Sequence, residues 1–286
     1  MLSLHTNNAA LSAQNSINRT QGSLSTSMTR LSTGYRINSS MDDAAGLQIA
    51  TRLKAQTSGM AVAMRNTQNS TSMLQTAEGA LDEVSNMLVR MKDLATQAAD
   101  ASSTAADKTA MQSEYDALGT ELYNVMNNTT FGGAKLLAGG TIASSMTFQI
   151  GSSTSEKMVV DMSASMTTLG TDVLATTANY AAVAVTGTEL TAAGTASTSI
   201  DKLSTAIASI GTVRSALGAS ANRLEHVYNN LSNISTNSKA ATGRIMDVDF
   251  ASESSKMTTS QMLLQAGTAM LKQSNSMSSM VMSLLQ

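Results

Sequence analysis

Apolar residues recur at seven-residue intervals near both ends of the chain. The two stripes consist of Ala10, Ile17, Leu24 and Leu31, and of Leu263, Met270, Met277 and Leu284. A stripe with this spacing runs along one side of a helix and is satisfied when another helix packs against it. Leu264 and Leu271 lie beside the second stripe. The pattern predicts terminal helices over about residues 5–33 and 250–285.

A longer heptad pattern predicts one uninterrupted helix from about residue 43 to residue 99. One heptad position carries Leu53, Met60, Leu74, Leu81 and Leu88, and the position three residues later carries Ala63, Ala77, Val84, Met91 and Ala98. Apolar residues at alternating spacings of three and four are typical of long paired helices. Further helices are expected over about 106–128 and 197–243. The latter carries Leu203, Ile210, Leu217, Leu224 and Leu231 at heptad spacing.

Turn-forming residues mark the places where these helices begin and end. Gly34 follows the first helix, as glycine commonly does at a helix C-terminus. Ser40 followed by Asp43 resembles a capping box for the next helix. Over about residues 146–162, two short alternating segments flank a polar stretch, which predicts a β-hairpin. Residues 163–195 are rich in Thr, Ala and Gly and carry no clear pattern.

Together these elements predict a mainly α protein, an elongated antiparallel bundle of long, coiled-coil helices with a small β-hairpin insert. The chain folds back at the insert, so that the terminal helices pair with each other. A helix of 50 residues would span about 75 Å. We expect three parts, which are residues 1–42 with 247–286, residues 43–165 with 196–246, and residues 166–195. They correspond to a terminal-helix domain, a long-helix rod and a short variable insert.

Composition favours slender helix packing over a thick globular core. The 286 residues include no Cys, Pro or Trp, three Phe and five Tyr, but 21 Met. The lack of Pro permits long helices, and the lack of Cys excludes disulfides and thiolate metal sites. A net charge of −2 without a basic tract argues against nucleic-acid binding. No apolar run reaches about 18 residues, so membrane insertion is not expected. The amino end also lacks the features of a cleavable Sec signal.

Candidate catalytic chemistry is missing from the sequence pattern. His5 and His226 are the only histidines, and no Cys or HExxH spacing accompanies them. Such isolated histidines are usually ordinary polar positions rather than metal ligands. We therefore expect no catalytic, cofactor-binding or metal-binding residues and no enzyme activity. A protease activity is the enzyme alternative, which an assay would test directly.

Several stretches of the chain resemble the signatures of one family, the bacterial flagellins. The resembling stretches are residues 30–50 (RLSTGYRINSSMDDAAGLQIA), 76–81 (TAEGAL), 217–224 (LGASANRL), 265–270 (QAGTAM) and the Ser-Leu-Leu tail at 283–285. The similarity covers about residues 1–165 and 197–286, with the motifs in the family's order. A specialised, lateral-type minimal flagellin is suggested by the high Met content, by Leu2 and by the short middle segment.

The resemblance implies a structural subunit that polymerises into the hollow helical filament of the bacterial flagellum, the motility propeller. It implies that the terminal helices form the filament core and that the heptad residues near both ends pack there. It also implies export through the flagellar type III apparatus, an extracellular location, and an export chaperone, a cap and hook-junction proteins as partners. A hook–filament junction protein, which shares the terminal helices, is the alternative.

The resemblance extends to three residues that match a receptor-contact pattern. Arg90, Leu94 and Glu114 correspond to positions through which an animal toll-like receptor recognises many flagellins. The surrounding segment, residues 89–95 (VRMKDLA), is similar to the family segment without being identical to it. Recognition of the monomer by this innate immune receptor is therefore an expectation to be tested.

Overall fold

The structure is a computed structural model that describes residues 7–183 and 185–284. Side chains are described as far as residue 277. The side chains of Leu2, His5 and the Ser-Leu-Leu tail at 283–285, which includes Leu284, therefore lie outside the described part of the chain. The predicted start of the first helix near residue 5 lies outside it as well.

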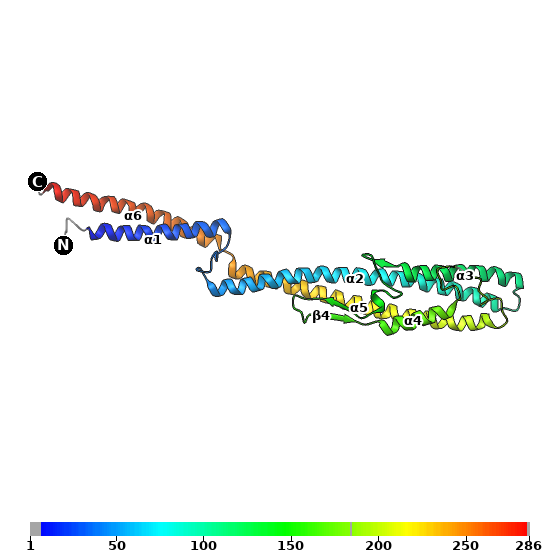
Figure 1. Ribbon diagram of the computed structural model, residues 1–286. Helices are drawn as coiled ribbons and strands as arrows, with labels where there is room; N and C mark the ends of the chain where they lie inside the picture. Colours follow the sequence, from blue (N-terminus) through cyan, green and yellow to red (C-terminus); the bar gives the residue numbers. More distant parts are fainter. Residues whose placement is uncertain (1–6, 184, 285–286) are drawn as a thin grey trace. The chain divides into compact units, whose positions relative to one another are not determined.

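Long helices dominate the described chain (Figure 1). The elements in order are α1 Asn8–Thr33, α2 Ala44–Ala99, α3 Ala105–Asn128, β1 Thr130–Phe131, β2 Ala134–Lys135, η1 Thr141–Ala143, β3 Met146–Gln149, β4 Lys157–Val160, α4 Ser163–Thr176, α5 Thr195–Met246 and α6 Phe250–Leu284. The expected fold class, mainly α with long helices and a small β-hairpin, is confirmed. The predicted helix ends at residues 33, 99 and 128 agree with the observed ones.

The first of two compact units comprises Met1–Thr57 and Thr236–Gln286. Within it, α1 and α6 run side by side and antiparallel (Figure 1). The segments that follow α1 and precede α6 also pair, because Tyr35 and Asp247 form an antiparallel bridge. The backbone N–H of Val248 donates a hydrogen bond to the Gly34 carbonyl at 3.0 Å. Helices and connections from both ends of the sequence are thus joined in this unit.

Local capping explains where α1 ends and where α2 begins. Gly34 ends α1 in the left-handed conformation, with φ of 75°, and its N–H donates to the Arg30 carbonyl at 2.9 Å. At the start of α2, Asp43 Oδ1 accepts a hydrogen bond from the Gly46 N–H at 2.8 Å. The expected capping box led by Ser40 is therefore wrong. Asp43 directly precedes the helix and is itself the N-cap.

The second compact unit, Ser58–Ser235, holds the main hydrophobic core. Its centre is formed by heptad residues of α2 and α5. They are Leu74, Leu81, Leu88, Leu203, Ile210, Leu217 and Leu224, all of them buried. Met60 and Leu231 continue the heptad rows in a second, smaller cluster. On the surface, Arg214 of α5 forms ion pairs with Glu78 and Asp82 of α2 at 2.8 and 2.9 Å. The antiparallel pairing of these two long helices agrees with the sequence expectation.

The remaining elements of this unit cover the α2–α5 core. Strands β3 and β4 form the expected hairpin, with Met146 paired to Val160 and Gln149 paired to Lys157. The segment without a clear sequence pattern contains α4, which buries Leu169 and Val173. The fully buried Tyr115 of α3 donates a hydrogen bond from its hydroxyl to the carbonyl of Thr176, where α4 ends, at 2.7 Å. Burial raises the pKa of this phenol.

Candidate assembly surface

Polar contacts fix the register of α1 against α6. At one end of the pair, Asn7 Nδ2 donates a hydrogen bond to Ser274 Oγ at 3.1 Å. Nearer the other end, Ser27 Oγ donates to Glu253 Oε1 at 2.7 Å. Ser27, Glu253 and Ser274 are also the buried residues among those described on the two helices. The interior of this pair is therefore polar at its buried points, unlike an ordinary apolar helix seam.

A close helix approach lies between the two polar contacts. Gly267 of α6 faces Ile17 of α1, and a Cβ atom at Gly267 would lie 2.9 Å from Ile17 Cγ1. The absence of a side chain at Gly267 thus makes room for Ile17. Other apolar residues of the two helices are only half-buried, among them Ala10, Leu24, Leu31, Met257, Leu264 and Leu271.

The two stripes predicted from the sequence have different environments. Ala10, Ile17, Leu24 and Leu31 are the half-buried residues of α1 that line the pair. On α6, the neighbouring residues Leu264 and Leu271 take this role instead. Leu263, Met270 and Met277 remain 57, 67 and 53% exposed, and Met262 is 58% exposed. We call Met262, Leu263, Met270 and Met277 the outer stripe. The side chain of Leu284 lies outside the described residues.

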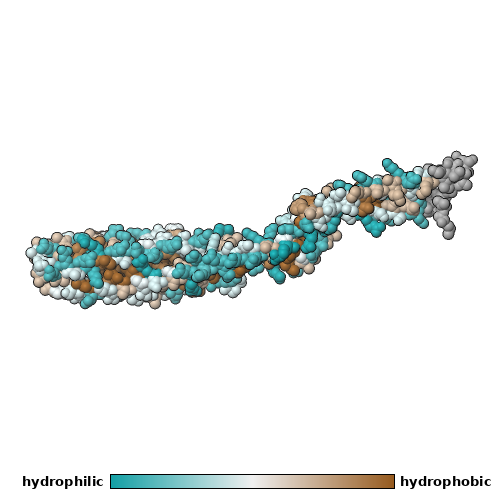
Figure 2. All heavy atoms as spheres, turned by 180° about the vertical axis from the view of Figure 1, so that it is seen from behind, coloured by the Kyte–Doolittle hydropathy of each residue, from teal (hydrophilic) through white to brown (hydrophobic). Residues whose placement is uncertain are grey.

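Hydrophobic residues reach the surface along the helix pair in the space-filling view (Figure 2). On α1, Leu11 and Met28 are 50 and 49% exposed. At the start of α6, Phe250 is 58% exposed. Burial of apolar surface contributes roughly 25 cal/mol per Å². Covering these exposed apolar side chains would therefore further stabilise the helix pair.

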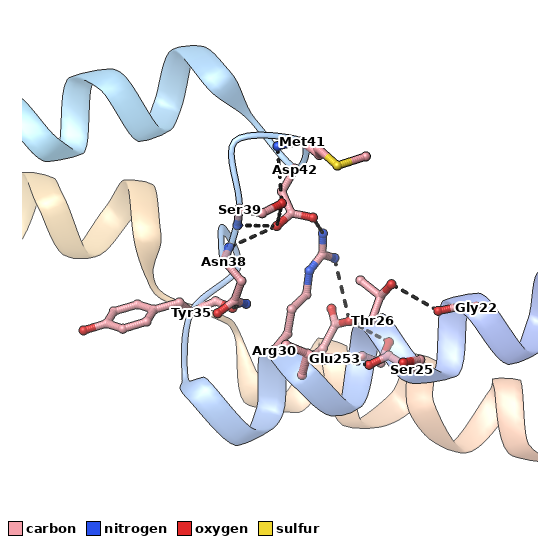
Figure 3. A network of polar contacts seen from close by, with 12 residues as sticks. Gly22, Ser25, Thr26, Arg30, Tyr35, Asn38, Ser39, Met41, Asp42 and Glu253 are labelled. Atoms are coloured by element: carbon pink, nitrogen blue, oxygen red, sulfur yellow. Dashed lines mark hydrogen bonds and ion pairs between the residues drawn. The ribbon is translucent and has the colours of Figure 1, made fainter.

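A charged cluster surrounds Glu253 at the α1–α6 interface (Figure 3). Arg30 lies between two carboxylates, 3.8 Å from Glu253 Oε1 and 4.0 Å from Asp42 Oδ1. Lys256 Nζ lies 3.3 Å from Glu253 Oε2. The Ser27 hydroxyl, followed by the charges of Lys256 and Arg30, lowers the pKa of Glu253 against the opposing effect of burial. Glu253 is therefore ionised at neutral pH.

Asp42 holds the connection after α1 in the same cluster (Figure 3). Its Oδ2 accepts hydrogen bonds from the backbone N–H groups of Asn38 and Ser39 at 3.0 and 2.9 Å. The backbone N–H groups of Ser39 and Asn38 lower the pKa of Asp42, as does the nearby charge of Arg30. Arg30 thus connects this loop with α6 through a chain of charge pairs.

Sequence reasoning did not single out this polar cluster. A signal was present, because small or polar residues repeat every seven positions in α6 beside the apolar stripes. They are Glu253, Ser260, Gly267 and Ser274. Such a row allows close helix approach, while its charged member requires a partner across the seam.

The candidate receptor residues lie in the second unit. Arg90 Nη2 and Glu114 Oε1 form an ion pair at 2.7 Å, with side chains 55 and 45% exposed. Leu94 is only 3% exposed and belongs to the hydrophobic core. The structure therefore places Arg90 and Glu114 together on the surface and Leu94 beneath it.

The described part of the chain contains neither a metal-binding cluster nor a membrane-spanning helix. Within residues 7–183 and 185–284, no group of three or more His, Cys, Asp or Glu side chains is arranged to hold a metal ion. None of the described helices combines the length and apolar character needed to cross a membrane.

Curated relatives of the chain are flagellins of other bacteria. Polar flagellin F of Vibrio parahaemolyticus is 47% identical over 161 residues, which are 56% of this chain and 42% of that protein. The B-type flagellin of Pseudomonas aeruginosa is 47% identical over 161 residues, which are 56% of this chain and 33% of that protein. The matched part thus spans less than half the length of these relatives.

Two solved structures resemble this one. The crystal structure of Bacillus cereus flagellin is 34% identical, with a TM-score of 0.46, and the match covers 62% of this chain and 94% of that one. A candidate flagellar hook-associated protein from Vibrio parahaemolyticus is 16% identical, with a TM-score of 0.57, and the match covers 72% of this chain and 100% of that one. At this identity the second likeness concerns the fold alone.

Two family models match most of the sequence. The bacterial flagellin N-terminal helical region matches residues 4–141, and the bacterial flagellin C-terminal helical region matches residues 200–285. These regions contain the sequence signatures described above and the whole of α1 and α6. The chain therefore belongs to the bacterial flagellin family.

Proposed function

We propose that the chain is a structural subunit that polymerises into the hollow helical filament of the bacterial flagellum. It acts as part of the motility propeller and has no enzyme activity. Open helical polymers need heterologous contacts, in which one surface of a subunit binds a different surface of the next. The α1–α6 pair offers apolar surface for such contacts along its whole described length.

The observation that carries this proposal is the distribution of burial in the α1–α6 pair. Its buried described side chains are polar, whereas the residues of the outer stripe are more than half exposed. A pair of helices that turns large apolar residues to solvent gains stability when further copies cover them. Covering by copies of the same chain is the simplest way to bury this repeated surface.

The domain assignment follows from the same reasoning. We assign residues 1–42 and 247–286 to the filament core, residues 43–165 and 196–246 to a surrounding rod, and residues 166–195 to a short variable insert. The core assignment includes both predicted heptad stripes, with the outer stripe between subunits. The high Met content and short insert support a minimal, lateral-type subunit.

Export and partners extend the proposal. The subunit passes through the flagellar type III apparatus and functions outside the cell, with an export chaperone, a filament cap and hook-junction proteins as further partners. Threading through a narrow channel requires that the long helices be unfolded during passage. Helices that realise their stability only after assembly suit this requirement.

Electron microscopy of the purified chain tests the proposal directly. Ammonium sulfate or short filament seeds are added to monomer, and long filaments are expected. The matched variants are Met270→Asp with Met277→Asp, which place charge on the outer stripe, and Met41→Asp, which places charge on a 95% exposed loop residue. Filaments should form with the loop variant and fail with the outer-stripe variant.

A hook–filament junction protein is the second candidate function. The fold likeness to a hook-associated protein supports this candidate, because junction proteins share the terminal helices. A junction protein would add to a partner surface without growing further. A monomer that is folded in its Ser58–Ser235 unit but forms no filaments, even on seeds, would therefore support this alternative.

We also propose that the monomer is a ligand for an animal toll-like receptor. The exposed ion pair between Arg90 and Glu114 supports this proposal, whereas the burial of Leu94 limits its direct contribution. In a receptor reporter-cell assay, wild-type monomer should signal, and the Arg90→Ala and Glu114→Ala variants should signal less. Silence of the wild-type monomer at saturating dose would contradict the proposal.

A further inference from the structure

Methionines of the core and methionines of the outer stripe differ sharply in exposure. In the Ser58–Ser235 unit, Met91, Met126 and Met60 are 0, 2 and 3% exposed. On the outer stripe of α6, Met262, Met270 and Met277 are 58, 67 and 53% exposed. Oxidants reach exposed sulfur atoms far more readily than sulfur atoms in a packed core. The three outer-stripe methionines are therefore accessible to oxidants in the monomer, as are Met28 and Met41, whereas the three core methionines are not.

We propose that Met262, Met270 and Met277 are an oxidation-sensitive modification site that controls assembly. Peroxide converts these side chains to methionine sulfoxide, and a subunit modified in this way no longer joins the filament. The inference rests on the proposed function, because it requires that the outer stripe be buried between subunits. It adds a modification chemistry and a regulatory consequence to that surface.

The chemical step is balanced with hydrogen peroxide as the oxidant. The thioether sulfur attacks one peroxide oxygen, an S–O bond forms and the O–O bond breaks. The sulfur is oxidised by two electrons, and the second oxygen leaves as water after proton transfer. The product carries a polar S=O group in place of a thioether. Methionine sulfoxide reductases of two stereochemical types reverse the change.

The position of these side chains explains why the modification opposes assembly. An apolar, flexible thioether packs readily between helices, whereas a sulfoxide is polar and requires a hydrogen-bond donor. The outer-stripe residues next to Met270 on its face are apolar, including Leu263. Burying an unpaired polar group in such a contact weakens association by about tenfold or more per site.

The same geometry predicts that assembled subunits are protected. Once the outer stripe is covered by neighbouring copies, its sulfur atoms are no longer accessible to peroxide. Oxidation then acts on the free monomer and spares existing filament. The stripe therefore makes filament growth, rather than filament integrity, responsive to oxidants.

The test compares three full-length chains: the wild type, a Met262→Leu, Met270→Leu and Met277→Leu variant, and a Met41→Leu control. Leucine retains the volume and apolar character of methionine but cannot form a sulfoxide. Met41 is 95% exposed and lies in the connection after α1, away from α6. Monomers receive a peroxide dose at which mass spectrometry finds Met60, Met91 and Met126 unmodified. Growth on untreated seeds is then measured by electron microscopy.

We expect oxidised wild-type monomer and oxidised Met41→Leu monomer to elongate about tenfold or more slowly than their untreated forms. The triple-leucine variant should elongate equally well before and after treatment. Peptide mapping should find the three outer-stripe methionines oxidised in monomer and protected in filament. Treatment with both types of sulfoxide reductase should restore growth of the wild type.

Two results would overturn the inference while leaving the proposed function intact. One is a triple-leucine variant that loses growth as strongly as the wild type. The other is wild-type monomer that elongates normally with all three sulfur atoms oxidised. Failure of untreated wild-type monomer to elongate on seeds is a different result, because it would overturn the proposed function and the inference together.

Discussion

Glu253 is a buried charge whose contacts come from both terminal helices. Its carboxylate accepts a hydrogen bond from Ser27 of α1 at 2.7 Å and lies near Arg30 of α1 and Lys256 of α6. A buried ion pair is a weak source of net stability, but removing one partner leaves the other uncompensated. The contacts of Glu253 therefore determine the register of α1 against α6, and they add little to the strength of the pairing.

The pKa of Glu253 makes the helix pair sensitive to acid. Because its folded-state pKa is lowered, the stabilisation is present above the ordinary glutamate value of about 4.3 and is lost as pH falls through the folded-state value. Glu253→Gln filaments should be weaker at neutral pH and change less in stability on acidification below about pH 4. Sedimentation of filaments across this range measures the effect.

The control for this prediction is Glu83→Gln, at an exposed position of α2. Filaments of the control should follow the wild-type acid profile. An unchanged acid profile in Glu253→Gln filaments would mean that the buried carboxylate does not govern acid stability.

Tyr115 links α3 to the end of α4 through one buried hydrogen bond. Tyr115→Phe removes the hydroxyl donor and leaves the Thr176 carbonyl without that bond. We expect the free energy of unfolding of the monomer to fall by about 1–2 kcal/mol. Urea denaturation followed by circular dichroism measures it. Tyr35→Phe, at a residue that is 47% exposed, should change the midpoint little, and equal effects of the two variants would refute this account.

At the scale of elements, heptad spacing predicted the long helices because the signal is repeated many times within each one. The ends of α1 and α2 lie within a few residues of their predicted positions, and Gly34 supplies a local stop. Heptad spacing alone does not determine which of two adjacent apolar stripes packs against the partner helix. On α6, both Leu263 and Leu264 begin plausible apolar stripes, and Leu264 is the one that lines the pair.

A matched pair of glycine substitutions tests the close approach of α1 and α6. In a helix interior, replacing Gly with Ala stabilises the helix by about 1 kcal/mol. At Gly22 of α1 a new Cβ meets nothing within 4 Å, whereas at Gly267 it lies 2.9 Å from Ile17. Gly22→Ala should therefore strengthen filaments against urea, and Gly267→Ala should weaken them or leave them unchanged. A gain of equal size at both positions would show that the approach is not tight.

The terminal helices should be less stable in the monomer than the Ser58–Ser235 core. The described apolar residues on α1 and α6 are all half-buried or exposed, whereas the second unit has a large buried core. Isolated helices of such amphipathic sequence are marginal in water. Amide hydrogen exchange should give weak protection in α1 and α6 of the monomer and strong protection in the filament. Equal protection in the two states would contradict coupling between helix formation and assembly.

At the scale of the whole molecule, the division into two units separates folding from assembly. The Ser58–Ser235 unit contains its own core, which does not depend on the residues of α1. A chain that lacks residues 1–33 should therefore keep cooperative thermal unfolding but fail to elongate on filament seeds. Circular dichroism and electron microscopy measure the two properties. Seeded growth of the truncated chain would contradict the role given to the helix pair.

The sequence by itself determined the properties that are repeated or local. Periodic apolar residues specified long helices and the α2–α5 pairing, since every heptad contributes the same information. Alternation over 146–162 specified the hairpin, and the ordered signature motifs specified the family. The resemblance identified Arg90 and Leu94 as candidate receptor residues. It did not predict that Arg90 is exposed and Leu94 is buried.

Only the tertiary structure decided which faces and which polar groups meet. The choice of Leu264 over Leu263 as the inner residue depends on the space that Gly267 leaves for Ile17 and on the partners that Ser27 and Arg30 offer Glu253. These contacts join residues more than 200 positions apart, as for Ser27 and Glu253. The fit between two surfaces depends on the volume and polarity of both, and neither surface is encoded in the periodicity of the other.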